Sequence, residues 1–358
     1  MGDRFIKILK GLESIMTSNA TNSPHVNHPK SVLSRLAIIF AGQGSQSQGM
    51  LADWATQYPQ VNDTFSTASA ALGFDLWAVC QGTIDLSLDD TAYTQPALLT
   101  ASMAIWQILQ QEFGFTPSRL QGSYLAGHSL GEYSALCAAG VFSLTDAVKL
   151  VHQRGQLMSQ AMHTTDGDKI IAIEGKMAAV LGLEDEQVRV ICEMVRENNA
   201  GAIVNPANFN SPGQVVIAGN ALGVDLAVAQ VSLQGNRSMP LKVSVPSHCE
   251  LMHPATEQLA ETLHAMQFNA PQIPVIQNRH ARVEADIAAI KQALIEQLSM
   301  PVLWSKTQDL LANKHIALQI ECGSGNILTN LAKRQHHPIT TLATDKVTKL
   351  DKIREILA

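Results

Sequence analysis

The sequence lacks the features that would place it in a membrane or on nucleic acid. No uninterrupted apolar stretch among its 358 residues approaches the roughly 18 residues that a membrane-spanning helix needs. The net charge is −6, from 25 basic and 31 acidic residues, so the chain carries no general basic field for nucleic acid. We therefore expect neither a membrane nor a nucleic-acid partner.

Cysteine is also sparse, and its spacing fits neither a metal site nor a redox motif. The five cysteines are scattered, lack C-x-x-C spacing and lie mostly in apolar segments, where thiols usually serve as small core residues. This usage predicts a reducing, cytoplasmic compartment. No metal-ligand cluster or internal repeat appears, because His25/His28 and His336-His337 lack partner spacing. We expect no metal and no cofactor.

Residues 1–35 differ from the rest of the chain. An apolar face of a short amphipathic helix is followed by a Ser-, Asn-, His- and Pro-rich stretch typical of a linker, over residues 5–16 and 17–30. The segment has no secretory hydrophobic core, and Ile6 stands where an N-myristoylation signal needs Ser or Thr. We interpret residues 1–35 as a flexible N-terminal extension.

From Leu36 onward the pattern predicts an α/β domain in two parts, residues 36–160 and 241–358. Residues 36–40 are a continuous apolar run, as expected for a strand buried on both faces of a parallel sheet, and a glycine-rich turn follows. Residues 123–126 and 315–320 repeat this strand pattern. A length prior of about 150 residues per domain is consistent with roughly two domains.

Residues 161–240 have a different pattern. Strand-like runs at 177–181, 202–207, 214–218 and 239–245 alternate with helical patterns at 185–197 and 222–234. The order βαββαβ predicts a ferredoxin-like small domain inserted into the larger one. A cleft between two such domains is a favoured ligand site.

The motif Gly127-His128-Ser129-Leu130-Gly131 follows a predicted strand and opens a predicted helix. In this context Gly-x-Ser-x-Gly forms a nucleophile elbow, in which the serine projects from a sharp turn and the helix directs its N-terminal dipole at developing negative charge. A serine placed in this way can attack a carbonyl carbon. The pentapeptide alone is equally compatible with an ordinary loop.

A nucleophilic serine needs a base and a substrate anchor. His248, after the turn Pro246-Ser247, is the leading candidate for the base; His128, His152, His253, His264 and His315 stay open on pattern alone. Arg154, on a helix predicted from about Leu144, could clamp a carboxylate through two hydrogen bonds, or could be an ordinary solvated helix charge.

Seven motifs in register over residues 36–335 resemble malonyl-CoA:acyl carrier protein transacylase. They are Gly42-Gln43-Gly44-Ser45-Gln46, Thr94-Gln95-Pro96-Ala97, the stretch from Gly127 to Leu136, Arg154-Gly155, the stretch from Asn208 to Gln214, Val245-Pro246-Ser247-His248-Cys249, and Gln297 with Pro301-Val302-Leu303-Trp304. The resemblance implies an α/β-hydrolase-like large domain with a ferredoxin-like insert. It also implies transfer of malonyl from malonyl-CoA to an acyl carrier protein, the step that supplies extender units for fatty-acid synthesis.

The resemblance also implies a role for each matching residue. Ser129 would be the nucleophile and His248 the general base, while the backbone amides of Gln43 and Leu130 would form the oxyanion hole. Arg154 would hold the malonyl carboxylate, with Gln43 also at the substrate. The main-chain carbonyl of Gln297 would orient the histidine in place of a triad carboxylate.

The chain departs from the family pattern at three places. The N-terminal extension has no counterpart, the segment from His163 to Lys176 looks longer than usual, and Arg279-His280 replaces an acidic residue. The longer segment could alter carrier-protein docking or the mouth of the cleft. The core chemistry is untouched.

Three functions remain open. The chain could be the malonyltransferase of fatty-acid synthesis, a discrete acyltransferase acting in trans on a polyketide synthase, or a serine hydrolase. Hydrolases with this elbow place their histidine near the C-terminus, whereas His248 is followed here by a long segment, and a neutral ester gives Arg154 no purpose. A non-catalytic binding module fits least well, because a full set of catalytic candidates is present.

The partners we expect are malonyl-CoA and a phosphopantetheinylated acyl carrier protein, with the chain itself a monomer. Carrier proteins are usually acidic, and this chain is also net negative, so docking needs a local basic patch. Lys333 and Arg334, after the loop Gly323-Ser324-Gly325, are candidates for it. A solvated helix face is the alternative interpretation.

Overall fold

The structure is a computed structural model, and it describes residues 32–166, 169–242 and 245–357. The predicted amphipathic helix and linker of the N-terminal extension lie outside the described residues.

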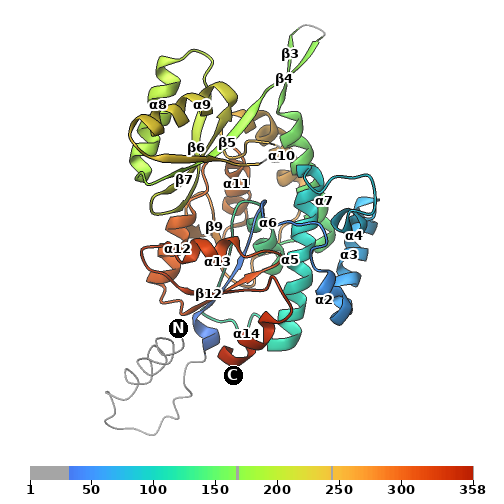
Figure 1. The fold of residues 1–358 in the computed structure, drawn as a ribbon. Coiled ribbons are helices and arrows are strands. Elements are labelled where there is room, and N and C mark those ends of the chain that lie inside the picture. Colours follow the sequence, from blue (N-terminus) through green and yellow to red (C-terminus); the bar gives the residue numbers. More distant parts are fainter. Residues whose placement is uncertain (1–31, 167–168, 243–244, 358) are drawn as a thin grey trace, which may run out of the picture. The chain divides into compact units, whose positions relative to one another are not determined.

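A six-stranded sheet forms the framework of the larger part (Figure 1). The strand order is β10-β9-β2-β1-β11-β12, and all neighbours are parallel except the β9–β10 pair. The strands are β1 (Leu36–Phe40), β2 (Tyr124–Gly127), β9 (Val275–Gln277), β10 (Arg282–Val283), β11 (Leu318–Cys322) and β12 (Thr340–Ala343). All five residues of β1 are buried, which confirms the prediction of a central parallel strand.

Side chains of β1 alternate between two apolar layers. Leu36, Ile38 and Phe40 belong to the larger core, which helices on one side of the sheet complete. Ala37 and Ile39 face a smaller core, to which helices on the other side contribute Trp304 and Leu328. Helices therefore cover both faces of the sheet, as the continuous apolar run in β1 requires.

The helices of this part begin and end as follows. They are α2 (Ala52–Gln57), α3 (Pro59–Leu72), α4 (Leu76–Gln81), α5 (Thr91–Phe113), α6 (Leu130–Ala138), α7 (Leu144–Gln160), α10 (His253–Ala265), α11 (Ile287–Gln297), α12 (Trp304–Asn313), α13 (Ile327–Ala332) and α14 (Lys349–Leu357), with short 3-10 turns η1 (Val32–Arg35) and η2 (Glu250–Met252). Helix α7 begins at the predicted Leu144, because the Ser143 hydroxyl accepts a hydrogen bond from the Asp146 amide and caps the helix.

A separate antiparallel sheet has the predicted order of elements. It consists of β5 (Gly175–Leu181), β6 (Val204–Ser211), β7 (Gln214–Asn220) and β8 (Arg237–Pro240), in the spatial order β6-β7-β5-β8. Helices α8 (Asp185–Asn198) and α9 (Ala221–Leu233) pack on it around their own apolar cluster. The order βαββαβ with the first and third strands in the centre is ferredoxin-like. We propose that the small domain spans residues 161–240.

The last predicted strand of this sheet was placed wrongly. The sequence predicts a strand over residues 239–245, but β8 ends at Pro240. The Leu241 amide, directly after β8, donates to the Met177 carbonyl. Leu241 and Lys242 line a cavity. Leu241 and Val245 therefore lie outside β8, and residues 243–244 of the predicted strand lie outside the described residues.

The long segment after α7 forms a hairpin. It contains β3 (His163–Asp166) and β4 (Lys169–Ala172), and Figure 1 shows it projecting beyond α7 at the end of the molecule that carries the small sheet. At its base the Ile173 amide donates to the Met162 carbonyl at 2.7 Å. Gly175 follows, where a Cβ atom would lie 2.5 Å from Pro246. The start of β5, directly after the hairpin, therefore packs against the turn that precedes His248.

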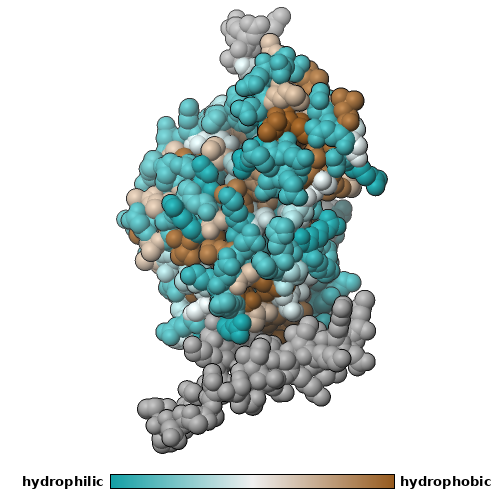
Figure 2. Space-filling view, turned by 90° about the vertical axis from the view of Figure 1, so that its left-hand side faces the viewer, coloured by the Kyte–Doolittle hydropathy of each residue, from teal (hydrophilic) through white to brown (hydrophobic). Residues whose placement is uncertain are grey.

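The face shown in Figure 2 is mainly hydrophilic, with apolar side chains in small separate groups. No helix in the described residues is long and apolar enough to cross a membrane.

Candidate active site

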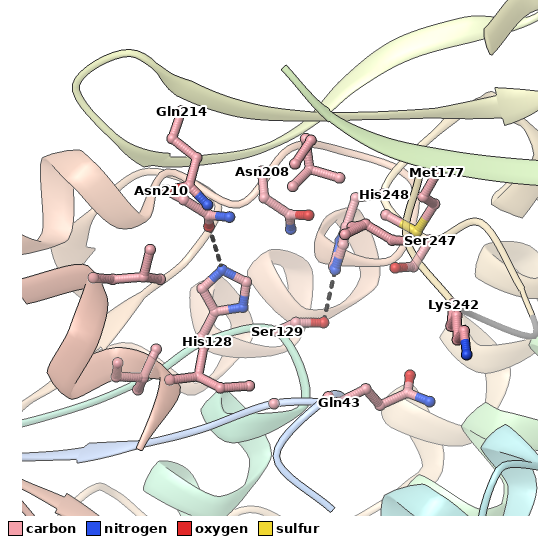
Figure 3. A pocket seen from close by; sticks show the side chains of 18 of the residues that line it. Gln43, His128, Ser129, Met177, Asn208, Asn210, Gln214, Lys242, Ser247 and His248 are labelled. Carbon is pink, nitrogen blue, oxygen red and sulfur yellow. Dashed lines mark hydrogen bonds between the residues drawn. The ribbon is translucent and has the colours of Figure 1, made fainter. Parts of the chain in front are cut away.

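The parallel sheet brings three loops from distant parts of the chain to one edge. Gln43 follows β1, Ser129 follows β2, and Asn278 follows β9. Because β1, β2 and β9 are parallel, their carboxyl ends meet at the same edge of the sheet. A cavity of about 620 Å³ opens there, and residues of the small sheet, among them Met177 and Asn208, line its other side (Figure 3).

Ser129 has a strained backbone between β2 and α6. Its φ of 54° and ψ of −111° lie outside the regions that a non-glycine residue ordinarily adopts. Such a conformation costs on the order of 1–3 kcal/mol and persists only where its surroundings enforce it. The Asn278 side chain accepts a hydrogen bond from the Ser129 amide at 2.7 Å, and Gln297 Nε2 donates to the Ser129 carbonyl at 2.9 Å. Two side-chain amides thus hold the elbow on both sides of the serine.

The two glycines of the motif are needed for close packing. A Cβ atom on Gly127 would lie 1.9 Å from the Gly131 backbone, and one on Gly131 would lie 2.0 Å from the Phe40 carbonyl oxygen. Any larger residue would separate α6 from β1 and β2. The strain of the elbow is therefore at Ser129, while the glycines allow the helix to begin directly against the sheet.

His248 is the histidine that the structure places beside Ser129. Its Nε2 lies 2.7 Å from Ser129 Oγ (Figure 3). Its Nδ1 lies 2.6 Å from the Gln297 carbonyl oxygen. A carbonyl oxygen only accepts, so Nδ1 carries the proton and Nε2 is left as the acceptor for the serine hydroxyl. This is the tautomer that a general base requires.

Burial keeps the His248 imidazole neutral. The ring is 1% exposed, and burial together with the nearby Arg154 guanidinium lowers its pKa from 6.5 to about 3. The backbone also has a positive φ of 62° at this residue. Both members of the serine–histidine pair are thus held in unusual backbone conformations, as is common where function fixes the geometry.

The other histidines that the sequence left open face elsewhere. His128 Nε2 lies 2.8 Å from Asn210 Oδ1, and Figure 3 shows its ring turned toward Asn210. His152 contacts the Ala92 carbonyl oxygen. His253 and His264 lie at the two ends of α10, and His315 follows α12. The structure places none of these rings against Ser129.

Arg154 is fully buried on α7, which excludes the interpretation as a solvated surface charge. Its Nη1 donates to Gln95 Oε1 at 2.7 Å and its Nη2 donates to Gln297 Oε1 at 3.2 Å, while Nε has no partner. Within the described residues no carboxylate lies within ion-pair distance of it. A buried cation without a paired anion is costly, and a ligand carboxylate would relieve that cost.

The loop after β1 lies against the elbow. A Cβ atom on Gly42 would lie 2.4 Å from the His128 carbonyl oxygen and 3.7 Å from the Leu130 nitrogen. The adjacent Gln43 lines the cavity, and its side chain donates to the Thr91 hydroxyl at 3.0 Å. Within the described residues the backbone amides of Gln43 and Leu130 have no protein acceptor. Both amides are available to a ligand oxygen beside Ser129.

Three further residues complete the site, and the sequence reasoning assigned a role to none of them. They are Gln95, Glu132 and Asn278. Glu132 is fully buried; its Oε2 accepts from Gln297 Nε2 at 2.7 Å and from the Asn278 amide at 3.2 Å. Burial raises the pKa of its carboxyl from 4.5 to about 7. Gln95 and Glu132 lie inside two of the motifs that resemble the transacylase family. The sequence marks Asn278 only by its position at the end of an apolar run.

The predicted docking residues lie next to the cavity but are not in its lining. Lys333 Nζ donates to Asn330, and Arg334 donates to Gln214 Oε1 at 2.9 Å. Gln214, Ile327, Leu328 and Leu331 all line the cavity, so α13 runs along its rim. Within the described residues no three metal-ligating side chains cluster together.

Comparison with known proteins decides the family. The model of the acyl transferase domain matches residues 37–334. The malonyl CoA-acyl carrier protein transacylase of Salmonella typhimurium is 46% identical over 319 residues, which is 89% of this chain and 98% of that protein. The Bacillus subtilis transacylase is 40% identical and covers 87% of this chain and 93% of its own length. The chain belongs to the malonyl CoA-acyl carrier protein transacylase family.

Solved structures agree with this assignment. FabD from Acinetobacter baumannii superposes with a TM-score of 0.83 at 45% identity, covering 90% of this chain and 98% of its own. The acyl carrier protein S-malonyltransferase from Vibrio cholerae superposes with a TM-score of 0.81 at 48% identity, covering 89% and 99%. A malonyl-transacylase in complex with a type II polyketide acyl-carrier protein gives a TM-score of 0.82 at 43% identity, covering 90% and 99%. The transacylase fold, with its large α/β part and small antiparallel sheet, is the fold of this chain.

Proposed function

We propose that this transacylase transfers malonyl from malonyl-CoA to the phosphopantetheine thiol of an acyl carrier protein through an ester on Ser129. The observation that carries the proposal is the short chain of contacts from Ser129 through His248 to the Gln297 carbonyl. A second observation, the buried and unpaired Arg154, supports malonyl as the acyl group.

In the first half-reaction Ser129 Oγ attacks the thioester carbonyl carbon of malonyl-CoA. His248 Nε2 takes the hydroxyl proton as the C–O bond forms, and then gives that proton to the sulfur of coenzyme A as the C–S bond breaks. The carbonyl oxygen carries negative charge in the tetrahedral intermediate. The amides of Gln43 and Leu130, with the N-terminus of α6 behind them, stabilise that charge by roughly 3 kcal/mol each.

The second half-reaction reverses these roles with a different thiol. His248 takes the proton from the carrier-protein thiol, and the sulfur attacks the Ser129 ester. The proton then returns to Ser129 Oγ as the ester breaks, so the malonyl group leaves on the carrier protein. Because one site serves both thiols in turn, the kinetics are ping-pong.

Arg154 recognises the free carboxylate of the malonyl group. The guanidinium is held by two neutral amide oxygens, from Gln95 and Gln297, so its positive charge is still available to an anion. A planar guanidinium gives a carboxylate two parallel hydrogen bonds, which are stronger than those between neutral groups. An acetyl group has no carboxylate and therefore makes no such hydrogen bonds with Arg154.

Fatty-acid synthesis is the pathway we propose for the malonyl product, since the relatives named above are FabD-type transacylases. The polyketide alternative uses the same Ser129, His248 and Arg154. Transfer rates to a fatty-acid carrier protein and to a polyketide carrier protein distinguish the two. We further propose that the enzyme acts as a monomer in the cytoplasm, where its five cysteines, each unpaired in the structure, stay reduced.

Intact mass spectrometry tests the proposed function directly. Brief incubation with malonyl-CoA should add one malonyl group, on Ser129, and subsequent addition of holo carrier protein should remove it. With coenzyme A thioesters of acetate and methylmalonate, the same measurement reports acyl selectivity. Rapid release of free malonate without transfer to any carrier protein would instead indicate a hydrolase.

A further inference from the structure

Gln297 contacts both halves of the proposed site through different atoms. It is the last residue of α11 and is fully buried. Its backbone carbonyl accepts the hydrogen bond from His248, whereas its side chain accepts from Arg154 and donates to the Ser129 carbonyl. The family resemblance explains only the backbone contact.

Glu132 determines which way the Gln297 amide faces. Its carboxyl oxygen Oε2 accepts from Gln297 Nε2 and from the Asn278 amide, so this oxygen serves as an acceptor. The nitrogen end of the Gln297 side chain must therefore face Glu132, and the oxygen end must face Arg154. A flipped amide would set two N–H groups against the N–H groups of the guanidinium.

A neutral acceptor suits this position for a physical reason. Gln95 and Gln297 orient the Arg154 guanidinium but leave its charge unpaired. A carboxylate in place of either amide would form an internal ion pair and compete with the acyl carboxylate for the arginine. An apolar side chain would let the guanidinium move.

We propose that the Gln297 side chain is the positioning residue that sets acyl selectivity, because it holds Arg154 in register with the Ser129 ester. The inference rests on the proposed function and deepens it. The backbone carbonyl is present whatever the side chain, so substitutions at this position keep the contact with His248. They change the side-chain contacts with Arg154, Ser129 and Glu132.

The test compares malonyl and acetyl loading of Ser129 in Gln297→Leu and Gln297→Glu. Both substitutions also remove or alter the hydrogen bond to the Ser129 carbonyl, which malonyl and acetyl loading share, so the ratio of the two is the readout. Loss of one hydrogen bond to a charged group lowers malonyl loading by about 10- to 100-fold more than acetyl loading. In Gln297→Glu the malonyl rate falls at least as far at pH 8 and partly recovers at low pH, where the new carboxyl is neutral. Gln308→Leu is the matched control, a buried glutamine on α12 bonded to Gln319, and keeps the wild-type ratio.

A wild-type ratio of malonyl to acetyl loading in both Gln297 variants would overturn the proposal. If both rates fell equally at an unchanged unfolding temperature, the side chain would support only the elbow. If Gln297→Leu does not fold, the pH dependence of Gln297→Glu decides. Failure of the proposed function itself is separate, because it would appear as absent malonylation of the wild-type enzyme.

Discussion

Nδ1 of His248 donates to the backbone carbonyl oxygen of Gln297 at 2.6 Å, at the place where a serine hydrolase of the triad type has a carboxylate. The carbonyl fixes the imidazole tautomer as a carboxylate would, but it supplies no negative charge to stabilise the imidazolium. Burial of the ring and the nearby Arg154 guanidinium disfavour the imidazolium further. The enzyme therefore has a well-oriented base that remains neutral at physiological pH.

Removing the nucleophile should abolish the acyl-enzyme. Ser129→Ala keeps the fold, because the elbow is held by contacts to the backbone of residue 129, but it has no oxygen to carry malonyl. Intact mass spectrometry after incubation with malonyl-CoA should show no added mass. Malonylation at the wild-type level would move the nucleophile to another residue.

The pH dependence of acylation should reflect the neutral histidine. The pKa of His248 is lowered to about 3, so protonation of the base should not limit kcat/KM for malonyl-CoA until well below the ordinary value of 6.5. The rate should be measured from pH 4.5 to 8 in wild type and in Glu132→Gln, since the Glu132 carboxyl also titrates near 7. An acid limb near 6.5 that persists in Glu132→Gln would contradict this account of His248.

Glu132 should make the protein less stable as pH rises. Its pKa is about 7 in the folded protein and 4.5 ordinarily, so between these values the native state holds a proton that the unfolded chain has released. The free energy of unfolding therefore falls across this window, by at most about 3 kcal/mol from this group. Urea unfolding at pH 5 and pH 8 should show a smaller loss in Glu132→Gln than in wild type. Identical losses in the two proteins would remove Glu132 as the cause.

Elements with strong local patterns were predictable from the sequence. The buried strand β1 and the capped helix α7 follow from an apolar run and a helix-start signal. Strand β1 spans the predicted residues, and helix α7 begins at the predicted Leu144. The strand predicted over 239–245 was misplaced, because apolar residues continue to alternate with polar ones past the end of β8, although β8 itself is short and mostly exposed.

The site was predictable only where a motif marked it. Ser129 and His248 stand in recognisable turns, and the structure brings them into contact. The contacts of Glu132 with Asn278 and with Gln297 could not be predicted from the sequence, because they join residues 146 and 165 positions apart and depend on the parallel order of β2 and β9. Their roles, like those of the oxyanion amides, remain predictions.

Charge reversal directly after α13 should separate the two half-reactions. Lys333→Glu with Arg334→Glu should weaken malonyl transfer to an acidic carrier protein and reduce the salt dependence of that step, while malonylation by malonyl-CoA changes little. Arg119→Glu is the control, because Arg119 is an exposed residue that precedes β2 and so lies at the opposite edge of the sheet. Equal losses in both half-reactions would show an effect on the cleft rather than on docking.

The central claim, that Arg154 makes this site a malonyltransferase, is tested most directly by the ratio of malonyl to acetyl loading on Ser129 in wild type, Arg154→Ala and Arg154→Lys. The account predicts that Arg154→Ala loses malonyl loading by several orders of magnitude and keeps or gains acetyl loading, since no buried charge then disfavours an apolar acyl group. Lysine should rescue malonyl loading only in part, because it keeps the charge without the two parallel donors. A ratio that stays constant across all three proteins would contradict the account and place carboxylate recognition elsewhere.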